Sequence, residues 1–240
     1  MIPVVIKELN AFFSSFAAYV IIGFFIILVG LLMWVFPETN ILDGGYAEMR
    51  TLFSYGPYIF MLLVPAITMH SFAEEKKTGT LELLLTTQLS TVSLILGKYF
   101  ASMLIILLII LLTMVYYLSI WHLGDPVGNI DSAGVFGSYI GLVLLVAVFC
   151  AIGLLASSIT EKQIVSFLVG VLFCFILYHA FDAWAILQTW SKYSLNISQI
   201  GIRYHYCALS KGVVDSRDLV YFIFVIVVLL HLTNKVINMR

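Results

Sequence analysis

Long apolar runs without Asp, Glu, Lys or Arg alternate with short polar segments along the whole chain. A helix needs about 20 apolar residues to cross roughly 30 Å of hydrocarbon, and backbone groups in hydrocarbon must find hydrogen-bond partners within their own segment. The pattern therefore predicts an all-α polytopic membrane protein with six transmembrane helices, in a single domain over residues 1–240. The six runs are 16–36, 51–73, 99–123, 133–160, 163–181 and 219–234, the last extending through Val236.

The first 16 residues show a different pattern, in which apolar side chains recur at helical spacing. Lys7, Glu8, Asn10 and Ser14 lie on the opposite face. One apolar and one polar face are typical of a helix that lies in the membrane interface. We expect an interfacial amphipathic helix here, and the alternative is an irregular start of the first span. The apolar face consists of Ile2, Val5, Ile6, Leu9, Phe13 and Phe16.

Composition supports the membrane assignment and excludes several other classes of protein. Hydrophobic residues make up 62% of the chain and charged residues only 10%, whereas soluble domains are about a quarter charged. A net charge of −1 gives no basic field that would hold nucleic acid. The three cysteines are far apart and form no CxxC pair, so neither a disulfide framework nor a metal site is expected.

The distribution of Lys and Arg predicts the orientation, because cytoplasmic loops carry more of these residues. With a cytoplasmic N-terminus, seven of the 12 lie inside and five outside, and without the segment 183–218 the comparison is seven to one. We therefore expect both termini in the cytoplasm. The apolar segment 183–218 predicts a hairpin of short helices that dips into the outer leaflet. The inside residues are Lys7, Lys76, Lys77, Lys98, Lys162, Lys235 and Arg240.

The stretch SFAEEKKTGTLELLLTTQLS, residues 71–90, gathers charged residues between the second and third spans. With Gly79 as N-cap, a short helix would place Glu82 near the free amides and the positive end of the helix dipole. Its leucines would fit a groove on another protein. The alternatives are a lid on the chain's own bundle, or charges that anchor the span ends. The residues concerned are Glu74, Glu75, Lys76, Lys77, Gly79, Thr80, Leu81, Glu82, Leu84 and Leu85.

The sequence FAEEKKTGTLELLLTTQLS resembles the signature of ABC-2-type permeases, in which an acidic-basic pair precedes Gly-Thr-Leu-Glu and a Leu-Leu pair. KELNAFFSS resembles the family's interfacial helix, and LGKYFA, residues 96–101, resembles the start of its third span. GNIDSAGVFGSYIGL and SKGVVDSRDLVYF resemble a narrower branch, the permease subunits of gliding-motility-associated ABC transporters. The resemblance covers essentially the whole chain, and one departure is Gln88-Leu89, where many family members have a proline.

The resemblance implies that residues 71–90 contain a coupling helix, which contacts a separate ABC ATPase subunit. It also implies a location in the bacterial cytoplasmic (inner) membrane and a second permease, either another copy of this chain or a related chain. In the gliding branch, an auxiliary subunit of the gliding complex is a further expected partner. Apart from the lipid bilayer and these proteins, no partner is expected.

Catalytic chemistry has no support in the sequence. The chain contains no G-x-x-x-x-G-K-[ST], the loop that holds nucleotide phosphates, so ATP and magnesium are expected in the partner ATPase and no cofactor in this chain. We expect a permease subunit and no enzyme. The alternatives are an ABC-2 exporter of lipid, drug or polysaccharide without a link to gliding, and a membrane anchor that transports nothing.

Some polar and small residues within the spans are further candidates. Pro57 and Pro65 predict a kink or hinge beside the charged stretch. His179 and Asp182 lie on one face of the fifth span, where ionisable groups are functional candidates, although capping the span near the outer interface is the favoured interpretation. Small residues four apart predict close contacts between spans. These pairs are Gly137/Gly141, Gly153/Ser157, Ser166/Gly170 and Gly97/Ala101.

Overall fold

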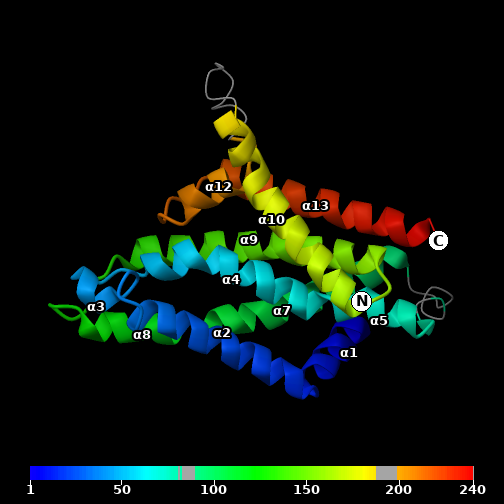
Figure 1. Ribbon diagram of the computed structural model, residues 1–240, viewed down its shortest axis with the longest axis horizontal. Helices are drawn as coiled ribbons and strands as arrows, with labels where there is room; N and C mark the ends of the chain where they lie inside the picture. The colour runs from blue at the N-terminus through cyan, green and yellow to red at the C-terminus, as the bar shows by residue number, and fades with distance from the viewer. Residues whose placement is uncertain (81, 83–89, 188–198, 240) are drawn as a thin grey trace.

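The computed structural model describes residues 1–80, 82, 90–187 and 199–239, and every regular element within these ranges is a helix (Figure 1). Six helical segments are long and apolar enough to cross a membrane. This confirms the predicted all-α fold with six spans. The helices are α1 (Ile2–Phe13), α2 (Phe16–Trp34), α3 (Ile41–Gly44), α4 (Arg50–Thr68), α5 (His70–Lys77), α7 (Thr91–Leu112), α8 (Met114–Leu123), α9 (Ser132–Ile159), α10 (Gln163–Leu187), α12 (Ile202–Leu209) and α13 (Ser216–Asn238).

Four spans are longer than the uncharged runs predicted, and the caps of two of them show the reason. The third span begins at Thr91, because Ser90 caps the helix by accepting a hydrogen bond from the Ser93 amide (3.3 Å). The last span covers Ser216–Asn238 and is capped by Asp215, whose carboxylate accepts from the Arg217 amide (2.9 Å). Marking spans as uncharged runs underestimated the lengths of these helices, because a helix can continue through charged residues up to its cap.

The span formed by α9 lies at the centre of the bundle (Figure 1). Its apolar stretch is 83% buried, compared with 22% for the spans of α2, α10 and α13. Helices α4, α7, α10, α12 and α13 all contact α9. The outer spans therefore keep apolar faces that are exposed on the isolated chain, as expected of helices that contact lipid or another subunit.

Small residues allow close approach within the bundle, and at Gly153 the contact is between two spans, as the spacing predicted. A Cβ atom on Gly141 would lie 2.5 Å from the Leu209 Cβ atom of α12. On Gly97 it would lie 2.9 Å from the Val4 Cβ atom of α1. Gly153 packs in the same way against Thr68 of α4. These glycines are therefore needed where helices touch.

The N-terminal segment is a separate helix and not the start of the first span. Ser14 and Ser15 interrupt the chain between α1 and α2, and the Ser15 hydroxyl accepts from the Ala17 amide (3.3 Å). Val4 is buried and Glu8 is partly buried against the bundle, a contact that the pattern did not predict, while Ile2 (69%) and Ile6 (53%) of the predicted apolar face are exposed. The position of α1 in the membrane interface stays a prediction.

The helical bundle has two ends that carry different elements (Figure 1). The N-terminus, α5 and the C-terminus lie at one end of the bundle, as an even number of spans requires. Helix α3 and the α8–α9 connection lie at the other end. Of the predicted hairpin within 183–218, the structure describes the extension of α10 to Leu187 and the short helix α12, while residues 188–198 lie outside the described part.

Candidate functional site

Helix α5 carries the first half of the charged stretch and extends the second span without a loop. Helix α4 continues as a helix through Pro57 and Pro65, and the interruption lies at Met69, between α4 and α5. The Met69 amide still donates to the Pro65 carbonyl oxygen (2.9 Å). The regular helix is thus interrupted four residues after Pro65, and the kink or hinge at the prolines remains a prediction.

The start of α5 is held by a side chain of the central span. The Ser157 hydroxyl accepts hydrogen bonds from the amides of Phe72 (2.9 Å) and Ala73 (3.0 Å) and donates to the Met69 carbonyl oxygen (3.2 Å). First-turn amides lack acceptors within their own helix. Ser157, which is fully buried, therefore supplies from α9 the cap that α5 lacks in its own sequence.

The four charged residues of α5 are not all exposed to solvent. Glu74 and Lys77 are exposed, and Glu74 lies 3.6 Å from the His70 imidazole. Glu75 is only 8% exposed. The Lys76 ammonium donates to the Ser158 carbonyl oxygen at the end of α9. Two of the four thus fix α5 to the bundle, and two are free to meet a partner protein.

The end of α5 leads directly into the predicted coupling helix. Gly79 has a φ of 71°, a conformation that glycine adopts without strain, and its amide donates to the Lys76 carbonyl oxygen (3.2 Å). Thr80 and Glu82 are helical and exposed. Leu81 and residues 83–89, which include Leu84 and Leu85, lie outside the described residues.

A buried ion cluster joins α5 to two other helices. Lys98 of α7 is 1% exposed, and its ammonium lies 2.7 Å from a Glu8 carboxylate oxygen, 2.9 Å from a Glu75 carboxylate oxygen and 2.7 Å from the Ser71 carbonyl oxygen. The ammonium donates hydrogen bonds to Glu8 and Ser71 and forms an ion pair with Glu75. The Phe72 ring lies 5.1 Å away and adds a cation–π contact.

The same cluster includes a weaker link at the surface. The Lys7 ammonium lies 3.2 Å from the Glu75 oxygen that Lys98 also contacts, and the Lys7 side chain is 60% exposed. The second Glu75 oxygen is buried and has no hydrogen-bond partner among the described residues. The cluster therefore has one strongly buried bridge, through Lys98, and one exposed bridge, through Lys7.

Sequence reasoning did not find this cluster. It assigned Lys98 to the cytoplasmic charges, Glu8 to the polar face of α1, and Glu75 to the charged segment that would contact a partner protein. The structure buries Lys98 within α7 and turns Glu8 toward it. The one available signal was the presence of a lysine next to Gly97, a residue whose missing side chain lets α1 approach α7.

The remaining intramembrane candidates lie toward the other end of the bundle. Asp182 pairs with Arg203 of α12 at 3.1 Å, while the His179 ring stacks on Tyr58 with 5.8 Å between ring centroids. The carboxylate of Asp218 lies 2.6 Å from the Nδ1 atom of His205. These contacts fix α12 to α10 and α13, which agrees with a structural role for Asp182.

A buried tyrosine also fixes α12 to the second span. Burial raises the pKa of Tyr206 well above its ordinary value. The hydroxyl donates a hydrogen bond to the Phe53 carbonyl oxygen of α4 (2.7 Å). Together with the close contact at Gly141, this bond makes α12 part of the packed bundle.

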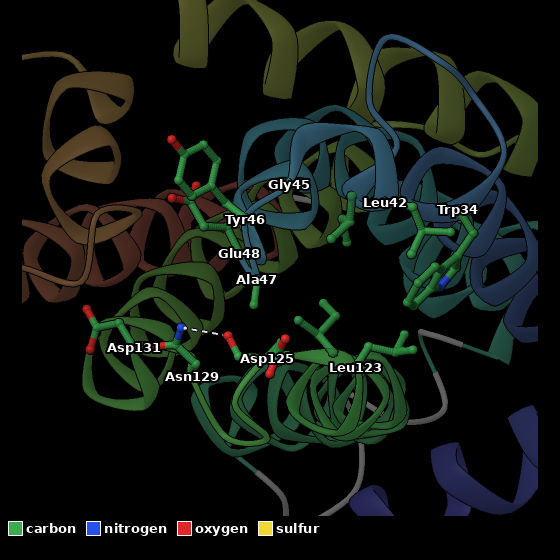
Figure 2. A pocket seen from close by; sticks show the side chains of 13 residues that line it. Trp34, Leu42, Gly45, Tyr46, Ala47, Glu48, Leu123, Asp125, Asn129 and Asp131 are labelled. Atoms are coloured by element: carbon green, nitrogen blue, oxygen red, sulfur yellow. Dashed lines mark hydrogen bonds between the residues drawn. The ribbon is translucent and has the colours of Figure 1, made fainter.

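A cavity of about 500 Å³ lies at the end of the bundle that carries α3 (Figure 2). Trp34, Leu42 and Leu123 give it apolar walls, while Asp125 and Asn129 add polar groups. It lies at the opposite end of the molecule from α5 (Figure 1), and none of its lining residues belongs to the ion cluster. The cavity and the ion cluster are therefore separate features.

The residues around α5 connect several helices of the bundle. Within the described part of the chain, no three His, Cys, Asp or Glu side chains gather closely enough to hold a metal ion. What the residues form is a short helix, α5, that is fixed to α9 by Ser157, to α7 by Lys98 and to α1 through Lys98 and Lys7. Beyond α5 the chain continues into the exposed residues Thr80 and Glu82.

Comparisons with known proteins point to a transport function. A family model described as ABC-2 family transporter protein matches residues 43–193, which is more than half of the 240-residue chain. The matched region contains α4, α5 and the whole charged stretch. A comparison with curated proteins finds no match.

Proposed function

Because the chain belongs to the ABC-2 family of transporter proteins, it is the membrane component of an ABC transporter, and we propose that residues 71–90 are the part that docks its ABC ATPase. The family implies both a membrane and an ABC ATPase partner. The ATPase subunit would bind and hydrolyse ATP with its magnesium. This chain would convert the resulting movement into a change of the path across the membrane.

The observation that carries the proposal is the way in which α5 is held. Lys77 at its end, and Thr80 and Glu82 just beyond it, are exposed and available to a partner. Ser71, Phe72 and Glu75 are tied to the spans. When a partner displaces a surface segment that is attached to a packed bundle, the helices of the bundle move with it, because tightly packed helices move together as rigid bodies. The predicted coupling helix at 80–89 would then be the contact and α5 its connection to the spans.

The proposal extends to location and assembly. Inside-positive charge supports cytoplasmic termini, and the N-terminus, α5 and the C-terminus share one end of the bundle (Figure 1). We place that end on the cytoplasmic side of a bacterial inner membrane. A second permease, which is another copy or a related chain, would complete the transport path. The stretches 128–142 and 210–222 support the gliding-motility-associated branch, with an auxiliary gliding subunit as a further partner.

A pull-down from the native membrane in detergent tests the docking proposal. The wild-type chain is expected to bring down a P-loop ATPase in stoichiometric amount, and Glu82→Ala and Leu84→Asp are expected to lose it. Glu38→Ala is the matched control, because Glu38 is equally exposed but lies at the α3 end. Retention of the ATPase by both docking variants at the wild-type ratio would show that docking occurs elsewhere.

The alternative of a membrane anchor predicts a different result in reconstituted membranes. A transporter couples ATP hydrolysis to movement of its spans, so ATPase activity in proteoliposomes should depend on the presence of this chain. An anchor would leave the activity of the ATPase unchanged. An exporter unrelated to gliding would give the transporter result but would lack the auxiliary gliding subunit in the pull-down.

A further inference from the structure

Lys98 is the central residue of the contact between α1 and α5. Glu8 of α1 and Glu75 of α5 each place a carboxylate oxygen within 2.9 Å of its ammonium. The two carboxylates would repel each other without it, so they share a position only because Lys98 lies between them. The lysine is 1% exposed and comes from a third helix, α7.

The relative burial of the two bridges decides which one holds α1. Exposed ion pairs contribute little because water and salt screen them, and the Lys7 side chain is 60% exposed. Charge-assisted hydrogen bonds away from water are stronger. The bridge from Glu8 to Lys98 is short, and its exposed fractions are only 22% and 1%. The link through Lys98 therefore dominates, and Lys7 adds little.

The backbone around Lys98 is also adapted to receive α1. Gly97 has no side chain, and a Cβ atom there would lie 2.9 Å from the Val4 Cβ atom. This lets α1 lie directly against α7 at Gly97, the residue that precedes Lys98. On the outer side of α1, Ile2 and Ile6 remain exposed, as suits a helix that rests on a membrane surface.

We infer that Lys98 is a positioning residue that fixes α1 and α5 as one unit, so that ATPase-driven movement of α5 also moves α1 along the membrane surface. The inference rests on the proposed docking function and adds a second moving part to it. Glu8 is the residue of α1 that receives this movement. Lys7 has no required role in it.

The test measures the distance between α1 and α5 in the purified transporter with its ATPase. Spin labels are placed at Ala11 and His70, which are exposed and lie outside the ion cluster, in a Cys207→Ser background that removes the exposed native cysteine. Distances are recorded without nucleotide and after trapping with ATP and vanadate. In the otherwise unaltered protein we expect one narrow distribution that is the same in both states.

Glu8→Gln removes the charge that Lys98 holds, so we expect its distribution to broaden and to differ between the two states. Lys7→Gln is the matched control and should behave as the unaltered protein does. Gly97→Ala provides a second route, because it pushes Val4 away without changing any charge, and it should also broaden the distribution. Both test variants are first required to elute as single folded complexes with the ATPase bound; a lower melting temperature is expected and does not prevent the distance measurement.

Two results would overturn the inference. One is a narrow, state-independent distribution in Glu8→Gln, and the other is equal broadening in Lys7→Gln. The proposed function fails in a separate way, if the purified wild-type chain carries no ATPase at all. A chain that binds its ATPase but keeps α1 in place in Glu8→Gln would disprove only the role of Lys98.

Discussion

The Ser157 hydroxyl on α9 lies 2.9 Å from the Phe72 amide on α5, so the central span caps the helix that leads toward the proposed docking segment. The same oxygen accepts from the Ala73 amide (3.0 Å). One side chain thus satisfies two buried backbone donors. This contact connects the most buried helix of the bundle with the charged stretch.

Ser157→Ala is expected to destabilise the chain by about 1–3 kcal/mol, because it leaves two buried amides without an acceptor. Thermal unfolding in detergent measures the change. Ser166→Ala is the matched control, since the Ser166 hydroxyl is buried but has no partner among the described residues. Equal melting temperatures for the two variants would contradict the capping role of Ser157.

Lys98→Met is expected to cost about 3–5 kcal/mol, because removing one partner of a buried ion pair leaves the other charges uncompensated. The triple variant Glu8→Gln, Glu75→Gln and Lys98→Met carries no such charges. It should therefore recover much of the loss in the same unfolding experiment. If Lys98→Met unfolds at the wild-type temperature, Lys98 is not held in the cluster.

Gly141→Ala is expected to destabilise the bundle by about 1–3 kcal/mol through overpacking. The added Cβ atom would lie 2.5 Å from the Leu209 Cβ atom, which must move together with α12. Gly23→Ala serves as the comparison, since nothing lies within 4 Å of a Cβ atom there. An unchanged melting temperature in Gly141→Ala would show that α12 does not pack closely on α9.

Asp182→Asn is expected to change stability by about 0–1 kcal/mol, because its partner Arg203 is 41% exposed and such pairs contribute little. Co-purification of the ATPase should not change, since Asp182 is near the C-terminal end of α10 (Gln163–Leu187) and pairs with α12, not with α5. Thermal unfolding and a pull-down measure both expectations. Loss of the ATPase in Asp182→Asn would assign Asp182 a role in coupling.

The sequence predicted the elements of this fold better than their contacts. Six spans follow from apolar runs, and the contact of Gly153 with α4 follows from the spacing of small residues, because both signals are local. The ion cluster does not follow, because Glu8 and Lys98 are 90 residues apart in the chain and only the packing of α1 on α7 brings them together. A lysine at the start of an apolar run is more often an anchor at the membrane surface.

The sequence of the charged stretch, residues 71–90, likewise did not predict the contacts of its individual residues. Its composition identified the segment, but it could not separate Glu75, which is 8% exposed, from its exposed neighbour Glu74. The difference arises because α5 is helical and presents consecutive residues to different sides. Ser157 was predicted as a small residue at a contact, and its hydroxyl proved to be a cap because α4 is interrupted at Met69.

Site-specific photo-crosslinking at Lys77 tests the central claim most directly, because Lys77 is exposed at the end of α5, just before the proposed docking helix. A crosslinking residue at Lys77 is expected to capture a P-loop ATPase in native membranes, identified by mass spectrometry. The same residue at Glu38, at the opposite end, should capture none. An ATPase captured from Glu38 and not from Lys77, or no ATPase from either position, would contradict the account.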